Sequence, residues 1–332
     1  MKNRKLIATI FSNAIHNEQV LCAAKLWADH NSIDFVLHCK KQVNPYYVTV
    51  VLVKYDGRTI LFDMSDSPEL VDVEDDISTY YKRSYVKNDS YDIHSYPVLP
   101  FGFNYGVTNN LFSLNRISAF GFDKVYTARS LPILNRLTNL SYSHIYYKRM
   151  HDIPRDNGGT ILFLTRLWDP ATVSSEEKKT FRKHLNAVRI ETVKNLKQKF
   201  KGRLIAGIAN TPLACKLCPE LIVPSNISSK GNYIKSLRNA DICVATNGLE
   251  NTLGWRIAEY VAFSKAVVSE PFHITVPNWN EGQHYLLFDT DLNEKIDALL
   301  YNKNYLQMQQ QNYEYYRQYM EPEKLFDRII TI

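Results

Sequence analysis

The stretch DICVATNGLENTLGWRIAEYVAFSKAVVSEP, residues 241–271, decides the fold class of this 332-residue chain. It predicts a buried strand over 241–245, a loop of small residues, a helix over 254–264 and a second buried strand over 266–269. A glycine-bearing loop that enters a helix N-terminus presents backbone N–H groups and the positive end of the helix dipole. The stretch therefore predicts an α/β fold with a loop suited to a phosphate group.

The first half of the chain alternates between strand and helix patterns in the same way. Apolar runs predict strands over residues 5–11, 33–39, 46–54 and 59–63, and a helix over about 15–30. Asp56-Gly57, between two of these strands, is a hairpin signal. The first sheet is therefore not expected to be purely parallel.

A second α/β series follows Pro154 and Gly158-Gly159, which mark the best domain boundary in the chain. Its pattern predicts strands over 160–165 and 203–208, a charged helix over 175–200 and mostly helical structure over 293–318. We therefore expect two Rossmann-like domains that face a central cleft, over residues 1–155 and 156–332. The last helix is a candidate to pack back on the first domain.

Composition excludes several classes of protein. Apolar residues make up 45% of the chain and charged residues 22%, so disorder is not expected, and 12 glycines with 13 prolines are too few for a collagen-like chain. The net charge of +6 suits a nucleotide phosphate or an anionic membrane surface, but does not by itself indicate nucleic acid, which we do not expect as a partner.

Five scattered cysteines fit a reducing compartment better than a disulfide framework. Cys215 and Cys218 form a CxxC without a second Cys or His pair at zinc-finger spacing, so structural thiols are favoured over a metal or redox site. The apolar stretch 6–11 is too short for a signal peptide, and no apolar run approaches the roughly 18 residues of a membrane-spanning helix. We expect a soluble, cytoplasmic protein.

The helix pattern also carries a family resemblance. Gly254, Glu259 five residues later, Ala262 and Ala266-Val267-Val268 follow the donor-site pattern of GT-B glycosyltransferases, in particular bacterial surface-polysaccharide enzymes related to glycogen synthase. The sequence GWRIAEYVA at 254–262 resembles a narrower subset of polysaccharide-locus transferases more closely. The resemblance covers about residues 160–290.

The resemblance implies a nucleotide-sugar site in the second domain. Glu259 would hold the ribose hydroxyls of the donor nucleotide. The loop before the helix would face the donor's phosphates and sugar, through Asn247, Gly248, Asn251, Thr252, Gly254 and Trp255. One position departs from the pattern, because the first glutamate of the family motif falls on Asn251.

A second matching element is the strand ILFLTRL at 161–167, which ends in Arg166. By resemblance, this arginine would neutralise the charge that develops on the leaving diphosphate. The family's companion lysine is not obvious at its usual spacing. Arg182, Arg189 or Arg256 could supply the second charge, and Arg256 is favoured because it shares a helix face with Glu259. The family needs neither a metal ion nor another cofactor.

Polar residues appear abruptly after the strand at 59–63. Asp63 and Asp66 are candidates to cap a helix beginning near Ser67-Pro68, which is the favoured interpretation. The alternative is acceptor binding or a general base that deprotonates an acceptor hydroxyl, for which Asp66 is our candidate. His16 and His94 are weaker candidates for that role.

Residues 80–87 mix tyrosines with Lys82, Arg83 and Lys87. The pattern favours a solvated helix face, with contact to anionic headgroups or lipid-linked acceptors as the alternative. That alternative carries our expectation of peripheral contact with the inner face of the cell membrane.

The resemblance implies a hexosyltransferase. It would move a sugar from a nucleotide diphosphate sugar to a hydroxyl of a glycan or lipid-linked glycan in bacterial surface-polysaccharide synthesis. Two alternatives stay open on the same fold. One is a nucleotide-sugar epimerase or phosphorylase. The other is a non-catalytic GT-B subunit, which is favoured by Asn251 at the position of the first glutamate of the motif.

Overall fold

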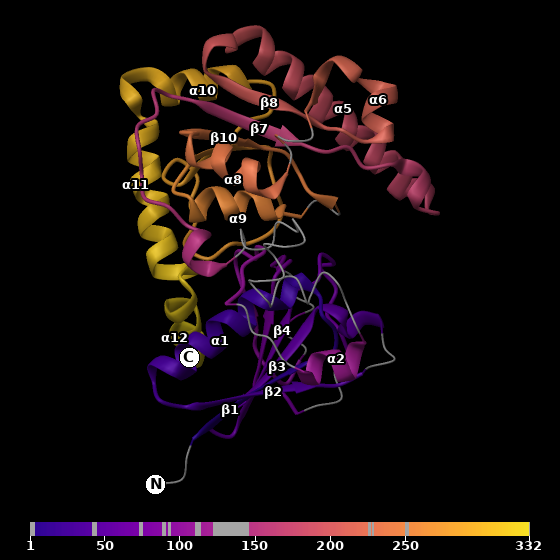
Figure 1. Ribbon diagram of the computed structural model, residues 1–332, viewed down its shortest axis with the longest axis vertical. Coiled ribbons are helices and arrows are strands. Elements are labelled where there is room, and N and C mark those ends of the chain that lie inside the picture. The colour runs from indigo at the N-terminus through magenta and orange to yellow at the C-terminus, as the bar shows by residue number, and fades with distance from the viewer. Residues whose placement is uncertain are drawn as a thin grey trace. The chain divides into compact units, whose positions relative to one another are not determined.

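The structure is a computed structural model in which the chain divides into two compact units (Figure 1). It describes residues 4–41, 45–72, 76–87, 91, 94–109, 114–121, 146–224, 227, 229–249 and 252–331. Unit 1 comprises Met1–His151, His273–Asn278 and Tyr315–Ile332, and unit 2 comprises Asp152–Phe272 and Trp279–Glu314. The chain thus first passes from unit 1 to unit 2 after His151, four residues before the predicted boundary after residue 155. Two later segments, not only the last helix, belong to unit 1.

Unit 1 is built on a mixed six-stranded sheet in the order β2-β1-β3-β4-β5-β6. Its strands are β1 (Lys5–Ile10), β2 (Asp34–Cys39), β3 (Val50–Tyr55), β4 (Arg58–Asp63), β5 (Thr79–Lys82) and β6 (Val98–Pro100). Only β3 runs antiparallel to its neighbours. The predicted β3–β4 hairpin is confirmed. Asp56 and Gly57 have φ values of 50° and 77°, as a two-residue turn of this kind requires.

The helices described in unit 1 are α1 (Glu18–His30), α2 (Leu114–Phe120) and α12 (Pro322–Thr331). Helix α12 packs on α1, where the rings of Trp27 and Phe326 lie 5.5 Å apart and Trp27 Nε1 donates a 3.1 Å hydrogen bond to Asp327. Leu325, Phe326 and Ile329 enter the same core as β1, β3 and β4. The C-terminal helix therefore belongs to the first unit's core.

Two predictions for unit 1 are wrong. No helix begins near Ser67, so Asp63 and Asp66 do not cap one. The segment predicted as a solvated helix face instead contains β5, in which Lys82 is fully buried. Charged residues such as Lys82 made this segment look solvent-exposed in the sequence. Lys82 can be buried because Asp63 lies opposite it in the β4–β5 register and compensates its charge.

Unit 2 is built on a fully parallel six-stranded sheet in the order β12-β11-β10-β7-β8-β9. Its strands are β7 (Ile161–Thr165), β8 (Leu204–Ala209), β9 (Ile222–Val223), β10 (Ile242–Ala245), β11 (Ala266–Ser269) and β12 (Tyr285–Leu287). The chain starts at the centre with β7, builds outward to β9, and then returns to the other side of β7 as β10. This is the strand order of the doubly wound dinucleotide-binding fold.

The longer helices that the structure describes in unit 2 are α5 (Glu176–Lys199), α6 (Pro212–Leu217), α8 (Lys230–Arg238), α9 (Trp255–Ala262), α10 (Leu292–Leu300) and α11 (Tyr305–Tyr315). Figure 1 shows α5 and α6 on one face of the strands and α8 and α9 on the other. Phe163, Val193 and Ile296 lie in the core between the sheet, α5 and α10. The α/β class is thus confirmed, with one mixed and one parallel sheet. Among the described residues, no helix is long and apolar enough to cross a membrane.

Candidate functional site

The candidate site lies where the strand order of unit 2 reverses. Strands β7 and β10 are neighbours, but the chain leaves them toward opposite sides of the sheet. Ligands of open α/β sheets bind outside the carboxyl ends of such strands. Arg166 follows β7 at this edge, Thr246 and Asn247 follow β10, and Glu270 follows β11.

Arg189 of α5 holds the two central strand ends together. Its Nη1 donates to the Arg166 carbonyl at 2.7 Å, its Nη2 to the Asn247 carbonyl at 2.8 Å and its Nε to Thr246 Oγ1 at 3.2 Å. The side chain is buried, and burial together with the positive charge of Arg256 lowers the pKa of Arg189 to about 10. It stays charged at neutral pH, and its donors are used mainly to fix the backbone.

Glu270 is a carboxylate whose negative charge acts on Arg189. One of its oxygens accepts a 2.9 Å hydrogen bond from the backbone N–H of Asn247. Burial raises the pKa of Glu270, while this hydrogen bond and the charge of Arg189 oppose the rise. Glu270 therefore fixes the start of the loop after β10. The side-chain amide of Asn247 makes no hydrogen bond to any described residue, so it can meet a ligand.

Arg166 is exposed and held by stacking. Its guanidinium carbon lies 4.0 Å from the ring centroid of Trp168. The buried Asn186 side chain makes two hydrogen bonds to the backbone of Trp168. Its Oδ1 accepts from the Trp168 N–H at 2.9 Å, and its Nδ2 donates to the Trp168 carbonyl at 2.8 Å. Burial and the charge of Arg256 both lower the pKa of Arg166. The stacking gives the guanidinium a defined position without neutralising it.

Arg256 stands in the first turn of α9, with its guanidinium 5.6 Å from the ring centroid of Tyr233. Within the described part of the chain, no carboxylate forms an ion pair with Arg166 or Arg256. Arg182 differs, because it donates to the Asp169 carbonyl at 2.8 Å and to Thr172 Oγ1 at 2.5 Å. Of the predicted partners of Arg166, Arg256 is thus the one whose guanidinium is not committed to backbone or hydroxyl oxygens.

Glu259 lies one turn further along α9 and is buried. Glu259 does not pair with Arg256 of the preceding turn, because its Oε1 pairs with Lys230, the first residue of α8. Tyr233, also on α8, has the cations of both Lys230 and Arg256 against its ring. Its buried hydroxyl has no hydrogen-bond partner among the described residues. Glu259 thus pairs with one of the two cations that lie against the Tyr233 ring.

The loop before α9 is folded tightly on itself. The backbone N–H of Gly248 donates to the Thr252 carbonyl at 2.9 Å, and Thr252 donates through its own N–H and hydroxyl to Leu249. A Cβ on Gly248 would stand 2.7 Å from the Thr252 carbonyl oxygen, so only glycine fits. Gly254 is the N-cap of α9 and Trp255 its first residue. Asn251, also predicted at this site, lies outside the described residues.

In unit 1 the polar residues after β4 form a buried network. Lys82 Nζ donates to Asp63 at 2.5 Å, to Ser65 Oγ at 2.9 Å and to the Glu69 carbonyl at 2.8 Å. The Tyr80 hydroxyl also donates to Asp63, at 2.7 Å. All three ammonium hydrogens are satisfied, so Asp63 and Lys82 fix the loop after β4 rather than face a ligand.

Asp66, the predicted catalytic carboxylate, pairs with Arg83 Nη1 at 2.6 Å. Its side chain is 43% exposed, whereas that of Arg83 is buried. His16, in the short 3-10 helix Ile15–Asn17 after β1, is influenced by both charges. Burial first and then Arg83 lower the pKa of His16 to about 4, while Asp66 opposes them. Asp66 and His16 therefore lie at the carboxyl edge of the first sheet, and His94 is drawn into a ring stack with Tyr96 instead.

The described residues contain no group of three or more His, Cys, Asp or Glu side chains that could hold a metal ion. All five cysteines are free thiols, with Cys215 exposed and Cys218 buried.

Sequence reasoning missed Lys230, Tyr233 and the role of Glu270. Lys230 and Glu259 are 29 residues apart, and only the docking of α8 beside α9 joins them. The only available signal was spacing, since Lys230 and Tyr233 lie one turn apart on a helix that precedes β10. Comparison with known proteins adds nothing further, because no family model and no curated protein matches this chain.

Proposed function

We propose that unit 2 binds the diphosphate of a nucleotide sugar and that the chain is a GT-B glycosyltransferase. It would transfer the sugar to a hydroxyl of a glycan or lipid-linked glycan, in bacterial cell-surface polysaccharide synthesis at the inner face of the membrane. One observation carries the proposal. Arg166 follows β7 and Arg256 begins α9 after β10, so that the charge of Arg256 acts on Arg166 near the strand-order reversal, and neither has a carboxylate partner among the described residues.

The charges around this point favour a dianion. Within the part of the chain that the structure describes, Arg166, Arg189, Arg256 and Lys230 face two carboxylates, those of Glu259 and Glu270, which leaves a surplus of two positive charges among these residues. A nucleotide diphosphate sugar carries one negative charge on each of its two phosphates. The positive charges of these side chains repel one another, and an anion that binds between them offsets this repulsion by its attraction to each of them.

The same arrangement would assist sugar transfer. When the bond between the sugar and the diphosphate breaks, negative charge accumulates on the leaving phosphate oxygen. Arg166 is already held by Trp168, and Arg256 by its place on α9, so both could stabilise that charge with little reorganisation. The N-terminus of α9, capped by Gly254, adds backbone N–H donors to the same edge.

Glu259 would accept hydrogen bonds from the two ribose hydroxyls of the donor. A carboxylate can accept two donors at once, and Lys230 pairs with one of the two Glu259 oxygens. On the acceptor side, Asp66 is the proposed general base, with His16 beside it as the alternative. Residues 80–83 do not support the expected membrane contact, because Lys82 and Arg83 are buried and cannot reach lipid headgroups.

A thermal-shift screen with UDP, GDP, CDP and dTDP sugars tests the proposal. At least one nucleotide should stabilise the wild type, because a ligand that binds only the folded state raises the melting temperature. Glu259→Ala and Arg166→Ala should lose most of that shift. Lys199→Ala is the matched control, since Lys199 pairs with Asp297 at the opposite end of α5 and its loss should leave the shift unchanged. If no nucleotide stabilises the wild type, the proposal is wrong.

A non-catalytic GT-B subunit is the second candidate, favoured by Asn251 at the position of the motif's first glutamate. It would bind the nucleotide without turnover. Incubation of the stabilising nucleotide sugar with the protein, followed by mass spectrometry of the sugar and the free nucleotide, separates the two. Release of the nucleoside diphosphate from wild type but not from Arg166→Ala supports the enzyme.

A further inference from the structure

Helix α11 crosses the amino ends of the strands of unit 2. The Tyr305 hydroxyl donates to Asp156, just before β7, Gln309 donates to Asp241, just before β10, and Asn312 donates to the Lys265 carbonyl, just before β11. Arg166, Asn247 and Glu270 lie at the opposite, carboxyl edge. A ligand site beside α11 is therefore separate from the proposed donor site.

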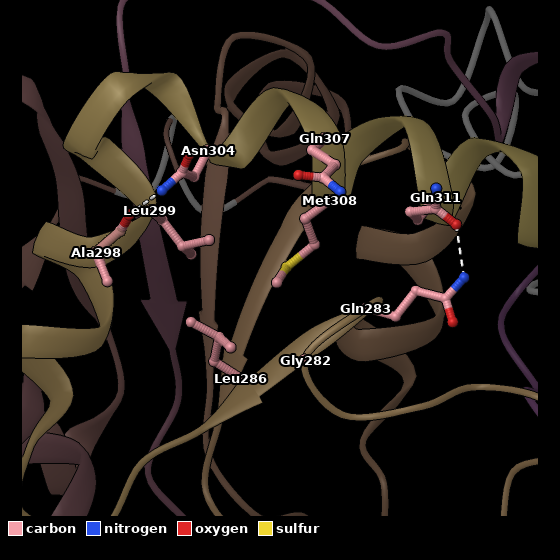
Figure 2. Close-up of a pocket in the computed structure, with 9 residues that line it drawn as sticks. All are labelled: Gly282, Gln283, Leu286, Ala298, Leu299, Asn304, Gln307, Met308 and Gln311. Carbon is pink, nitrogen blue, oxygen red and sulfur yellow. Dashed lines mark hydrogen bonds between the residues drawn. The ribbon is translucent and has the colours of Figure 1, made fainter.

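A groove of about 610 Å³ lies between α11, the end of α10 and the start of β12 (Figure 2). That volume is in the usual range of small-molecule sites. Figure 2 shows the side chains of Leu286, Leu299 and Met308 pointing into the groove, where they form an aliphatic floor. The loop before β12 forms the facing wall with Gly282 and Gln283.

Side-chain amides line the rim. Asn304 precedes α11, and Gln307 and Gln311 follow it at three and seven residues, so the three lie along one face. At 1.5 Å per residue, this row is about 10 Å long. Across the groove, Gln283 Nε2 donates to Gln311 Oε1 at 2.7 Å. The amide of Gln307 makes no hydrogen bond to any residue that the structure describes.

Helix α11 thus divides its amides between two tasks. Gln309 and Asn312 are fully buried and hold the strand ends. The amides of Gln307 and Gln311 face the groove instead, where Gln311 accepts from Gln283 and Gln307 makes no hydrogen bond to a described residue. None of the nine residues that line the groove carries a charge, so it offers nothing to neutralise a phosphate or a carboxylate.

We propose that this groove binds a neutral oligosaccharide. Asn304 Nδ2 donates to the Ala298 carbonyl at 3.0 Å, so Asn304 offers mainly its amide oxygen. Gln307 offers both a donor and an acceptor, and Gln311 keeps its amide donors, as pairs of sugar hydroxyls require. The aliphatic floor can cover the C–H face of a pyranose ring. The length of the row exceeds a single sugar ring. The choice of a glycan rests on the proposed function, because an extended peptide also presents alternating donors and acceptors.

The groove would anchor a glycan rather than take part in transfer. The four-residue strand β10 alone separates the two edges of the sheet by about 13 Å. A chain held at the amino edge would keep its free end at a raised local concentration near the protein. The proposed groove therefore favours glycan acceptors that are longer than the segment that reaches the proposed donor site.

Titration of the full chain with maltotriose, cellotriose and chitotriose, followed by saturation-transfer NMR and calorimetry, tests the proposal. At least one of these neutral trisaccharides should bind the wild type. Gln307→Ala combined with Gln311→Ala should weaken binding roughly tenfold, as expected for the loss of two hydrogen bonds. Gln283→Ala, on the facing wall, should weaken it independently. Gln310→Ala is the matched control, because Gln310 is exposed, bonds to Glu314 and does not line the groove.

Three results would overturn the proposal. They are the absence of binding by all three trisaccharides, equal binding by the double variant, and amide-dependent binding of trialanine in place of the sugars. Titration of the same variants with nucleotide sugars keeps the two claims apart. Nucleotide binding without trisaccharide binding refutes the groove alone. Amide-dependent trisaccharide binding without nucleotide binding refutes the proposed donor site and supports the groove.

Discussion

The stability of unit 1 should depend on pH through His16. The pKa of His16 is about 4 in the folded protein, because burial and the charge of Arg83 disfavour the protonated ring more than Asp66 favours it. In the unfolded chain a histidine titrates near 6.5. Between these values the unfolded chain binds a proton that the folded protein does not, so acidification favours unfolding.

The size of the effect follows from the interval between the two pKa values. About 2.5 pH units at 1.36 kcal/mol per unit give about 3 kcal/mol. This contribution is fully present above pH 6.5 and is lost as the pH falls toward 4. Carboxylates titrate in the lower part of the same window, so the contribution of His16 must be taken as a difference from a variant.

The assay is urea unfolding of the wild type and His16→Gln between pH 4.5 and 7.5. Pulsed hydrogen exchange of peptides from β1 and α1 reports the unfolding of unit 1 separately from that of unit 2. The difference in unfolding free energy between the two proteins should change by about 2 to 3 kcal/mol across the window, with the wild type losing stability more steeply. A constant difference over the whole range would refute the reasoning, because His16 would then titrate alike in both states.

Three further predictions concern single contacts. Lys82→Met should destabilise unit 1 by about 3 to 5 kcal/mol in urea unfolding, because it leaves the buried Asp63 carboxylate unpaired, and adding Asp63→Asn should recover part of that loss. Trp168→Leu should weaken nucleoside diphosphate binding about two- to fivefold in calorimetry, because the stacking that holds Arg166 is lost, whereas Trp168→Phe should retain most of it. Gly248→Ala should lower the same affinity, since its Cβ would meet a backbone oxygen 2.7 Å away and displace the loop; an unchanged affinity would show that the loop does not contact the ligand.

Much of the fold could be predicted from local patterns. The strands β7, β10 and β11 are apolar runs between polar loops, and Asp56-Gly57 specifies its hairpin through backbone conformation alone. Strand β5 could not be recognised in this way. Lys82 reads as a surface residue until the register of β4 and β5 places Asp63 opposite it.

The candidate site shows the same limit. Arg166 and Arg256 could be identified because each follows a recognisable strand or begins a recognisable helix. The clamp formed by Arg189 depends on how α5 docks on the sheet, and the pairing of Lys230 with Glu259 on how α8 lies beside α9. Such contacts join segments far apart in the sequence, which local periodicity does not specify.

The most direct test of the central claim is calorimetric titration of the full chain with UDP, GDP, CDP and dTDP. The charge surplus predicts that at least one binds the wild type. Arg166→Ala combined with Arg256→Ala should weaken binding about a hundredfold, roughly tenfold for each charged contact, while Lys199→Ala binds as the wild type does. Equal binding by the double variant and the wild type, or no binding of any nucleotide, would contradict the claim that the carboxyl edge of unit 2 holds a diphosphate.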